Sequence, residues 1–244
     1  MMKTTALAFV LAAAGCGVSD DVLKRQDDAE FHYKLGNGYF YDKEIVNALS
    51  ELQQCLALSP DHPDAHHLMG FIFFGKKEYA QAETHFRKAL SVRPGFHEAR
   101  ANLGALLVAT HRWQEAIEAL EPLESATLYP TPWLALNNIA YSYQKLKKTA
   151  PALKYYRLAL FNNPKFCLGY NNLGALYKEM GQSDMAIDYL QRATARCKQY
   201  PEPHFHLGEI YLAEGRTQDA RAEFSQCYKS APESSVGRRC KVRM

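Results

Sequence analysis

The sequence predicts an all-α protein, a right-handed superhelical solenoid of six consecutive helix pairs. Three observations predict it: a pattern that recurs at a spacing of 34 residues (82 − 48), a small residue at the eighth position of each copy, and Ala at each twentieth position. The twentieth-position residues are Ala48, Ala82, Ala116, Ala152, Ala186 and Ala220. An array of this kind presents a groove to a partner rather than a catalytic pocket.

The N-terminal segment has the features of an export signal. One lysine precedes an apolar run from Ala6 to Ala14 that is too short for a permanent spanning helix, so we expect residues 1–15 to be a signal peptide. The small residues before Cys16 resemble the bacterial lipobox, whose cysteine is acylated, for example with palmitate. This resemblance implies lipidation of Cys16, and Gly17 after it implies the periplasmic face of the outer membrane. Cleavage after Ala14, with Cys16 unmodified, is the alternative. We expect residues 16–28 to form a flexible tether.

Each copy from Ala29 to about Ser234 encodes two antiparallel helices. In the first helix, positions 4, 7, 8 and 11 form an apolar stripe, and the small eighth residue permits close approach of the second helix. The second helix has Ala at position 20, a large apolar residue at 24 and a small one at 27. Proline cannot continue a helix, and it closes four of the copies. These prolines are Pro60, Pro94, Pro164 and Pro232. The pattern resembles the tetratricopeptide repeat (TPR).

One step in the array is longer than the others. Ala116 and Ala152 are 36 residues apart (152 − 116), and the two extra residues fall in "ESATLYPTPW". We expect Pro130 and Pro132 to stop the second helix of the third repeat and Trp133 to begin the fourth repeat. The predicted organisation is repeats 1–3 over 29–132, a rigid elbow, repeats 4–6 over 133–234, and a basic tail over 235–244.

Six repeats, "LYPTP" after the third and a lipobox together resemble the type IV pilus biogenesis and stability lipoproteins. The sequence departs from that family at Ala13, where Leu is commonest, and at Ala140, where the other copies have Gly. The resemblance implies a pilotin that binds the pilus secretin and promotes its membrane insertion and multimerisation, as pilus assembly and twitching motility require. A general envelope TPR scaffold that serves another outer-membrane complex is the alternative.

A second stripe on the first helices, at positions 2, 5, 9, 12 and 13, is expected to line the groove. It is apolar in repeats 1–3, polar in repeats 4 and 5 (Asn137, Gln144 and Asn171), and apolar again at Phe205 and Leu212. The apolar half suits an amphipathic helix or an apolar strand of a partner. The alternative is that neighbouring helices bury these rings. The predicted partner-contacting residues are Tyr33, Asn37, Phe40, Tyr41, His67, Phe71, Phe74, Ala101, Ala105, Val108 and Tyr141.

Six cysteines in an exported chain favour disulfides. Cys55 and Cys227 occupy position 27, where the repeat requires a small buried residue, so packing explains both. The disulfide candidates are then Cys167, Cys197 and Cys240. We favour Cys167 with Cys197, because an antiparallel helix pair brings both ends of the fifth repeat to one edge. Cys197 with Cys240 is the alternative.

Composition and motifs argue against other functions. The net charge of +3 is spread along the chain, so we expect no nucleic-acid partner. His62 and His66 are four residues apart, but Pro63 begins a helix between them, so we expect no metal and no cofactor. The sequence contains no nucleophile elbow, phosphate loop or paired carboxylates, so we expect no enzymatic activity and no small-molecule substrate.

Overall fold

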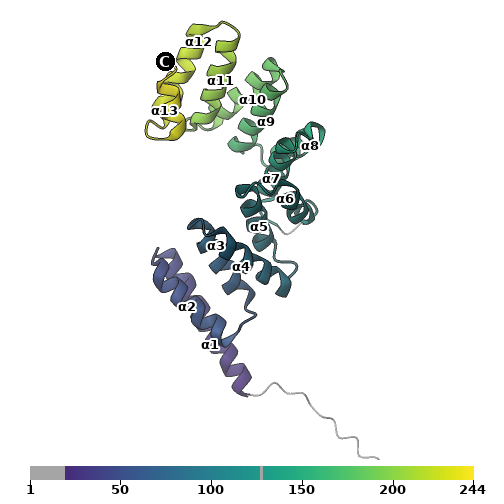
Figure 1. Ribbon diagram of the computed structural model, residues 1–244, viewed down its shortest axis with the longest axis vertical. Coiled ribbons are helices and arrows are strands. Elements are labelled where there is room, and N and C mark those ends of the chain that lie inside the picture. The colour runs from purple at the N-terminus through teal and green to yellow at the C-terminus, as the bar shows by residue number, and fades with distance from the viewer. Residues whose placement is uncertain (1–19, 127–128) are drawn as a thin grey trace, which may run out of the picture. The chain divides into compact units, whose positions relative to one another are not determined.

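The computed structural model describes residues 20–126 and 129–244, and within them the chain forms thirteen α-helices, one short 3-10 helix and no strand (Figure 1). The all-α, solenoid-like repeat fold predicted from the sequence is therefore confirmed. The helices are α1 (Asp20–Tyr41), α2 (Ile45–Leu58), α3 (Pro63–Gly75), α4 (Tyr79–Val92), α5 (His97–Ala109), α6 (Trp113–Leu120), η1 (Glu121–Leu123), α7 (Pro132–Lys145), α8 (Thr149–Asn162), α9 (Cys167–Glu179), α10 (Ser183–Arg196), α11 (Pro201–Ala213), α12 (Thr217–Ser230) and α13 (Ser235–Lys241).

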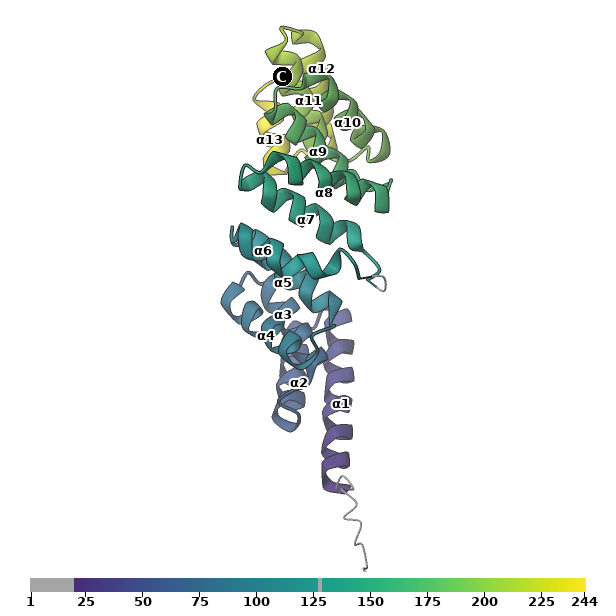
Figure 2. The ribbon, with the colours of Figure 1, turned by 90° about the vertical axis from the view of Figure 1, so that its right-hand side faces the viewer.

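Small residues hold the two helices of a pair together, as the repeat pattern predicts. Figure 2 shows the hairpin α7/α8 along its length, and Figure 1 shows the hairpin α11/α12. A Cβ atom added to Gly104 would lie 2.3 Å from Leu120 Cγ, and one added to Gly208 would lie 2.6 Å from Phe224 Cε1. Leu120 and Phe224 are fully buried. The eighth position is therefore small because the large residue at position 24 occupies the space beside it.

The turn inside each pair has one repeated conformation. Its central residue, at position 15 of the copy, has a left-handed backbone, with φ of 61° to 64° at the four non-glycine positions. These residues are Lys43, Lys77, His111 and Lys147, and Gly181 and Gly215 complete the series. The next N–H donates to a carbonyl five residues earlier, as from Glu44 to Tyr39 at 2.8 Å. This 6→1 hydrogen bond is the Schellman helix ending, which sets the direction of the second helix.

The predicted stops at Pro60, Pro94, Pro164 and Pro232 are confirmed, but the stop expected from Pro130 and Pro132 is wrong. Helix α6 already ends at Leu120 and passes into η1, because Pro122 has no N–H to continue the α-helical hydrogen bonds. Four second helices end two residues before a proline, because proline disfavours the helical conformation in the residue before it. The four helix ends are Leu58, Val92, Asn162 and Ser230. At the longer step, α7 begins at Pro132 and not at Trp133, because proline is well suited to the first position of a helix.

Contacts divide the chain into two compact units, residues 1–69 and 70–244. In the first unit α1 packs on α2 over Gly36, Ala48 and Leu52. Cys55 is fully buried there, and burial raises the pKa of its thiol to about 11. In the second unit one apolar cluster runs from Ile117 to Cys240 and includes side chains on both sides of Pro130 and Pro132. The contacts thus do not divide the chain at Pro132, where the sequence had indicated a boundary between two halves.

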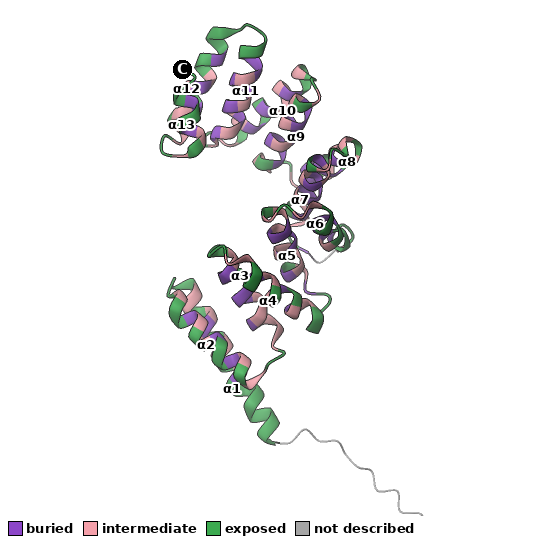
Figure 3. Ribbon diagram, viewed as in Figure 1, coloured by how far each residue is buried: buried purple, intermediate pink, exposed green. Residues whose placement is uncertain are grey.

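The N-terminal segment differs from the expectation of a flexible tether over 16–28. Helix α1 already begins at Asp20, and its first turns are exposed (Figure 3). Residues 20–28 contain neither Gly nor Pro, and Asp20 and Asp21 lie in the first turn, where the helix dipole favours acids. The predicted signal peptide and Cys16 lie outside the described residues. Across the described part of the chain, no helix combines the length and apolarity that a bilayer span requires.

Two disulfides tie the C-terminal repeats. The favoured pairing of Cys167 with Cys197 is confirmed, with Cα atoms 6.3 Å apart. The second bond joins Cys227 to Cys240, so the assignment of Cys227 to packing alone was wrong and the alternative pairing of Cys197 with Cys240 is excluded.

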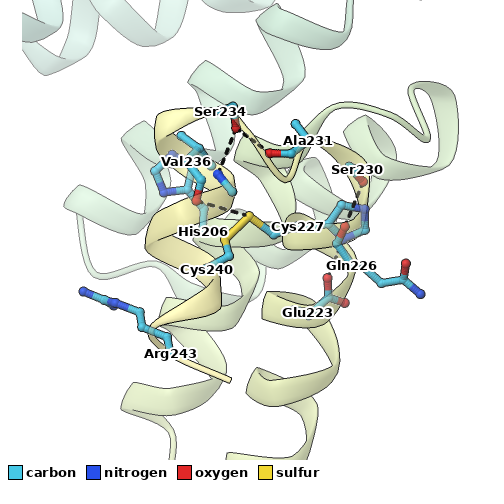
Figure 4. The surroundings of a disulfide bond; sticks show 12 residues. His206, Glu223, Gln226, Cys227, Ser230, Ala231, Ser234, Val236, Cys240 and Arg243 are labelled. Carbon is cyan, nitrogen blue, oxygen red and sulfur yellow. Dashed lines mark hydrogen bonds and ion pairs between the residues drawn. A yellow bond between two sulfur atoms is a disulfide. The ribbon is translucent and has the colours of Figure 1, made fainter.

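The reason for the second disulfide is that the expected tail over 235–244 folds as helix α13 and returns to α12 (Figure 4). Ser234 Oγ caps this helix by accepting a hydrogen bond from Gly237 N at 2.9 Å. A Cβ atom at residue 237 would lie 1.9 Å from the carbonyl oxygen of Ala231, so only glycine fits at this contact.

Candidate partner-binding surface

In the first unit, α1 presents aromatic side chains that are not part of the core. The Tyr33 ring lies 5.0 Å from the ring of His62, and His62 Nε2 lies 3.2 Å from Glu30 Oε2. Tyr41, at the end of α1, is 75% exposed. The remaining predicted residues of this unit, Asn37, Phe40 and His67, are half-buried. The first unit therefore offers accessible rings beside a histidine and a carboxylate.

In the second unit, predicted residues lie on the end of α3 and on α5. Phe71 is 42% exposed, and Phe74 is half-buried with its ring 6.0 Å from Tyr79. The small side chains on α5 are also half-buried. They are Ala101, Ala105 and Val108. None of these residues is fully buried, and their role in binding stays a prediction.

Tyr141 on α7 is the last of the predicted residues and is also half-buried. Its ring meets Trp113 edge to face, with ring centroids 5.8 Å apart. Lys145 Nζ lies 4.8 Å from the centre of the Tyr141 ring, within the range of a cation–π interaction. Tyr141 is therefore held in place by α6 and by its own helix.

A hollow of about 170 Å³ lies between α5, α7 and α9. Ala101 and Ala105, which the sequence predicted, form part of its wall, but the other apolar lining was missed. Tyr129 enters from the proline-rich segment, and Leu134 and Leu168 come from the first turns of α7 and α9. Ala135 and three amides, Asn102, Asn137 and Asn138, complete the lining.

The polar stripe of repeats 4 and 5 is more buried than the sequence indicated. Asn137, Gln144 and Asn171 are 3%, 6% and 5% exposed. Asn171 Nδ2 donates to Asn172 Oδ1 at 3.2 Å, and Asn172 Nδ2 donates to Asn137 Oδ1 at 3.1 Å. This row of three amides joins α9 to α7, because amides satisfy one another where water is excluded. Its terminal acceptor, Asn171 Oδ1, is buried and has no hydrogen-bond partner.

Helix α13 covers the corresponding surface of the sixth repeat. Phe205, expected to be a groove residue, is buried under the guanidinium of Arg239, which lies 4.1 Å from the ring centre. Arg243 Nη1 donates to Glu209 Oε1 at 3.0 Å. Burial first, and then the positive charges of Lys178 and Arg239, lower the pKa of His206 to about 4. The C-terminal end of the stripe is therefore occupied by the chain itself, although Leu212 remains exposed.

The histidines noted in the sequence are used in hydrogen bonding. His66 Nε2 lies 2.9 Å from the carbonyl oxygen of Pro60, and His62 contacts Glu30. Within residues 20–126 and 129–244, no three His, Cys, Asp or Glu side chains gather as metal ligands would.

A second hollow, of about 420 Å³, lies between α4, α5 and α6. Charged side chains line it, and Arg87 Nη2 lies 3.8 Å from Glu115 Oε2.

Comparisons with known proteins agree with this architecture. Tetratricopeptide-repeat families match residues 73–128, 135–166 and 171–235. The type IV pilus assembly protein PilF of Pseudomonas aeruginosa is 30% identical over 190 residues, which are 73% of this chain and 75% of PilF.

Two solved structures have a similar fold. The structure of Pseudomonas aeruginosa PilF has a TM-score of 0.74 at 21% identity, over 91% of this chain and all of that one. The structure of PilW, a widely conserved type IV pilus biogenesis factor, has a TM-score of 0.77 at 22% identity, over 86% of this chain and 97% of PilW. At these identities the structural likeness concerns the fold alone.

Proposed function

Because this chain belongs to the family of tetratricopeptide-repeat proteins of type IV pilus biogenesis that includes PilF, we propose that it is a pilotin. In this role it is an outer-membrane lipoprotein that binds the pilus secretin subunit. It promotes the insertion of the secretin into the membrane and its multimerisation. The protein acts by binding and not by catalysis.

The observation that carries this proposal is the accessibility of apolar side chains at the repeat positions where such proteins bind partners. Tyr41 is 75% exposed and Phe71 is 42% exposed. Large apolar side chains in water cost free energy that a partner recovers when it covers them, at roughly 25 cal/mol per Å². In the proposed role these accessible side chains would cover an apolar segment of the secretin subunit until it enters the membrane.

The proposed membrane anchor adds a second contribution. Acylation at Cys16 would hold the protein at the outer membrane, since each buried methylene contributes about 0.8 kcal/mol and several chains together bind firmly. A tethered binding site meets its partner at a high effective concentration, so a weak contact with the secretin suffices. Binding and anchoring thus act together in the proposed role.

The test is the amount of heat-resistant secretin multimer in membranes, measured by immunoblot in cells that lack the gene and carry variants of it. We expect the deletion to lose the multimer and to accumulate secretin monomer. Tyr41→Glu and Phe71→Glu should each reproduce part of this loss. Their matched controls are Val46→Glu and Val92→Glu, at positions that are 81% and 40% exposed, and these should behave as the unaltered protein does.

Two outcomes would contradict the proposal. If the multimer forms normally without the gene, the protein is not a pilotin. If deletion also lowers the amounts of unrelated outer-membrane proteins, the chain is a general envelope scaffold. Cys16→Ser tests the anchor separately, because it should lower the amount of this protein in the membrane fraction without altering the binding surface.

A further inference from the structure

The second position of the repeats changes character where the hollow lies. Four of the six copies carry an acid there: Glu30, Asp64, Glu98 and Glu202. Repeats 4 and 5 carry Leu134 and Leu168 in its place, and these side chains are 42% and 41% exposed. An acid at this position is favoured by the helix dipole, so both exchanges give up a stabilising residue. Both leucines line the same hollow.

The size of the hollow limits what it can hold. A volume of about 170 Å³ is close to that of an apolar protein cavity of about 150 Å³ that binds one benzene molecule. Pockets for small-molecule ligands start at about 300 Å³, so this one is too small for a cofactor or metabolite. It has room for one large aliphatic or aromatic side chain. Ala101 and Ala105 leave this room, because a larger residue at either position would fill it.

The amides beside the hollow are oriented by the row described above. Asn172 Nδ2 donates to Asn137 Oδ1, so the acceptor of Asn137 is occupied and its Nδ2 donor is left for another group. Asn138 lines the hollow as well. The row leaves Asn171 Oδ1 buried without a partner, which is unfavourable for the stability of the fold. Stability alone does not account for such a row, whereas the positioning of Asn137 does.

We infer that α5, α7 and α9 bind an extended polypeptide segment of the partner, with one large aliphatic or aromatic side chain in the hollow and a main-chain carbonyl accepting from Asn137 Nδ2. A helical segment does not fit this chemistry, because its main-chain carbonyls are already bonded within the helix. No charge is required of the segment at this point, since both acids are replaced by leucine. The identity of the segment in the cell rests on the proposed function, in which the secretin supplies it.

The test uses peptides that are independent of any secretin. A random library of linear twelve-residue peptides is displayed on phage and selected on the purified full chain. The strongest binder is then made as a fluorescent synthetic peptide, and its affinity is measured by anisotropy. We expect Leu168→Glu, which restores the acid of the other repeats, to weaken binding at least tenfold. Asn137→Asp keeps the acceptor for Asn172 but loses the Nδ2 donor, and it should weaken binding similarly.

Met185→Glu is the matched control, because Met185 is 40% exposed and lies on α10 outside this hollow. Circular dichroism establishes that each variant is folded. If no linear peptide is enriched, if the selected peptides bind as helices, or if Leu168→Glu and Met185→Glu bind equally well, the inference is wrong. If the selected peptide binds the unaltered chain and Met185→Glu but not Leu168→Glu or Asn137→Asp, the inference is supported. This holds even if the secretin multimer forms without the protein and the pilotin proposal fails.

Discussion

Replacement of Gly104 by alanine tests how the helix pairs are held together. The added Cβ atom would lie 2.3 Å from both Cγ and Cδ2 of Leu120, which is fully buried. Carbon atoms in contact are about 3.5–4.0 Å apart, so Leu120 must withdraw by more than about 1 Å. Overpacking of this kind costs about 1–3 kcal/mol, and the better helix propensity of alanine returns about 1 kcal/mol. Two Leu120 atoms, one of them the branched Cγ, lie at 2.3 Å, so the cost should fall in the upper half of that range, about 2–3 kcal/mol, and we expect a net loss of about 1–2 kcal/mol.

Urea unfolding followed by circular dichroism measures the loss in stability of the whole chain, and hydrogen exchange locates it in α5 and α6. Gly38→Ala is the control, because a Cβ atom there meets nothing within 4 Å. That change should stabilise α1 by up to about 1 kcal/mol through helix propensity alone. The two substitutions are chemically identical, so opposite signs would show that packing decides the outcome.

A double-mutant cycle identifies the clash itself. Leu120→Ala should cost about 2–5 kcal/mol through the cavity it leaves. In the double variant the new methyl group of residue 104 has room, so the combined loss should be smaller than the sum by at least about 0.5 kcal/mol. Strict additivity, or a Gly104→Ala chain as stable as the unaltered one, would refute the account of the eighth position.

Two further predictions concern the sixth repeat. His206 has a folded pKa of about 4 against an ordinary 6.5, so between these pH values the folded state binds fewer protons than the unfolded state. The free energy of unfolding should therefore fall by up to about 3 kcal/mol as the pH drops from 6.5 to 4. His206→Asn places at this position the residue type that repeat 5 has at Asn172, and it should remove this pH dependence when urea unfolding is measured over that pH range. Cys240→Ser removes the disulfide that closes a loop with a sequence separation of 13, and the free energy of unfolding should fall by about 3 kcal/mol. Amide hydrogen exchange should become faster in α13 and its contacts only. Unchanged protection of α13 would count against a stabilising role for this bond.

The sequence predicted the repeats well because their positions have strict local requirements. Ala at position 20 and a small residue at position 8 are needed in every copy, so six copies report the same geometry and chance agreement is excluded. The Cys167–Cys197 bond followed from the same geometry. These features depend on contacts within one repeat, which periodicity reveals.

The remaining features depend on contacts that periodicity does not report. Cys227 sits at a packing position, so its bond to Cys240 becomes visible only once α13 is placed. The sequence did contain one signal for that helix, because Ser234 is a residue type that favours the N-cap position and Gly237 follows three residues later. The burial of Asn137 and Asn171 results from amides on neighbouring helices, and the leucines at position 2 become meaningful only when the hollow brings them together.

The uniform turns inside the pairs have a consequence for how such a chain can change in length. One residue more in a turn would rotate the second helix by about 100° and would move the apolar face away from its partner. The connection between the third pair and the fourth already differs in length, because the two additional residues of this chain fall there. Insertions, whether by evolution or as an engineered tag, should therefore be tolerated between the third pair and the fourth and rejected at Lys77 or His111.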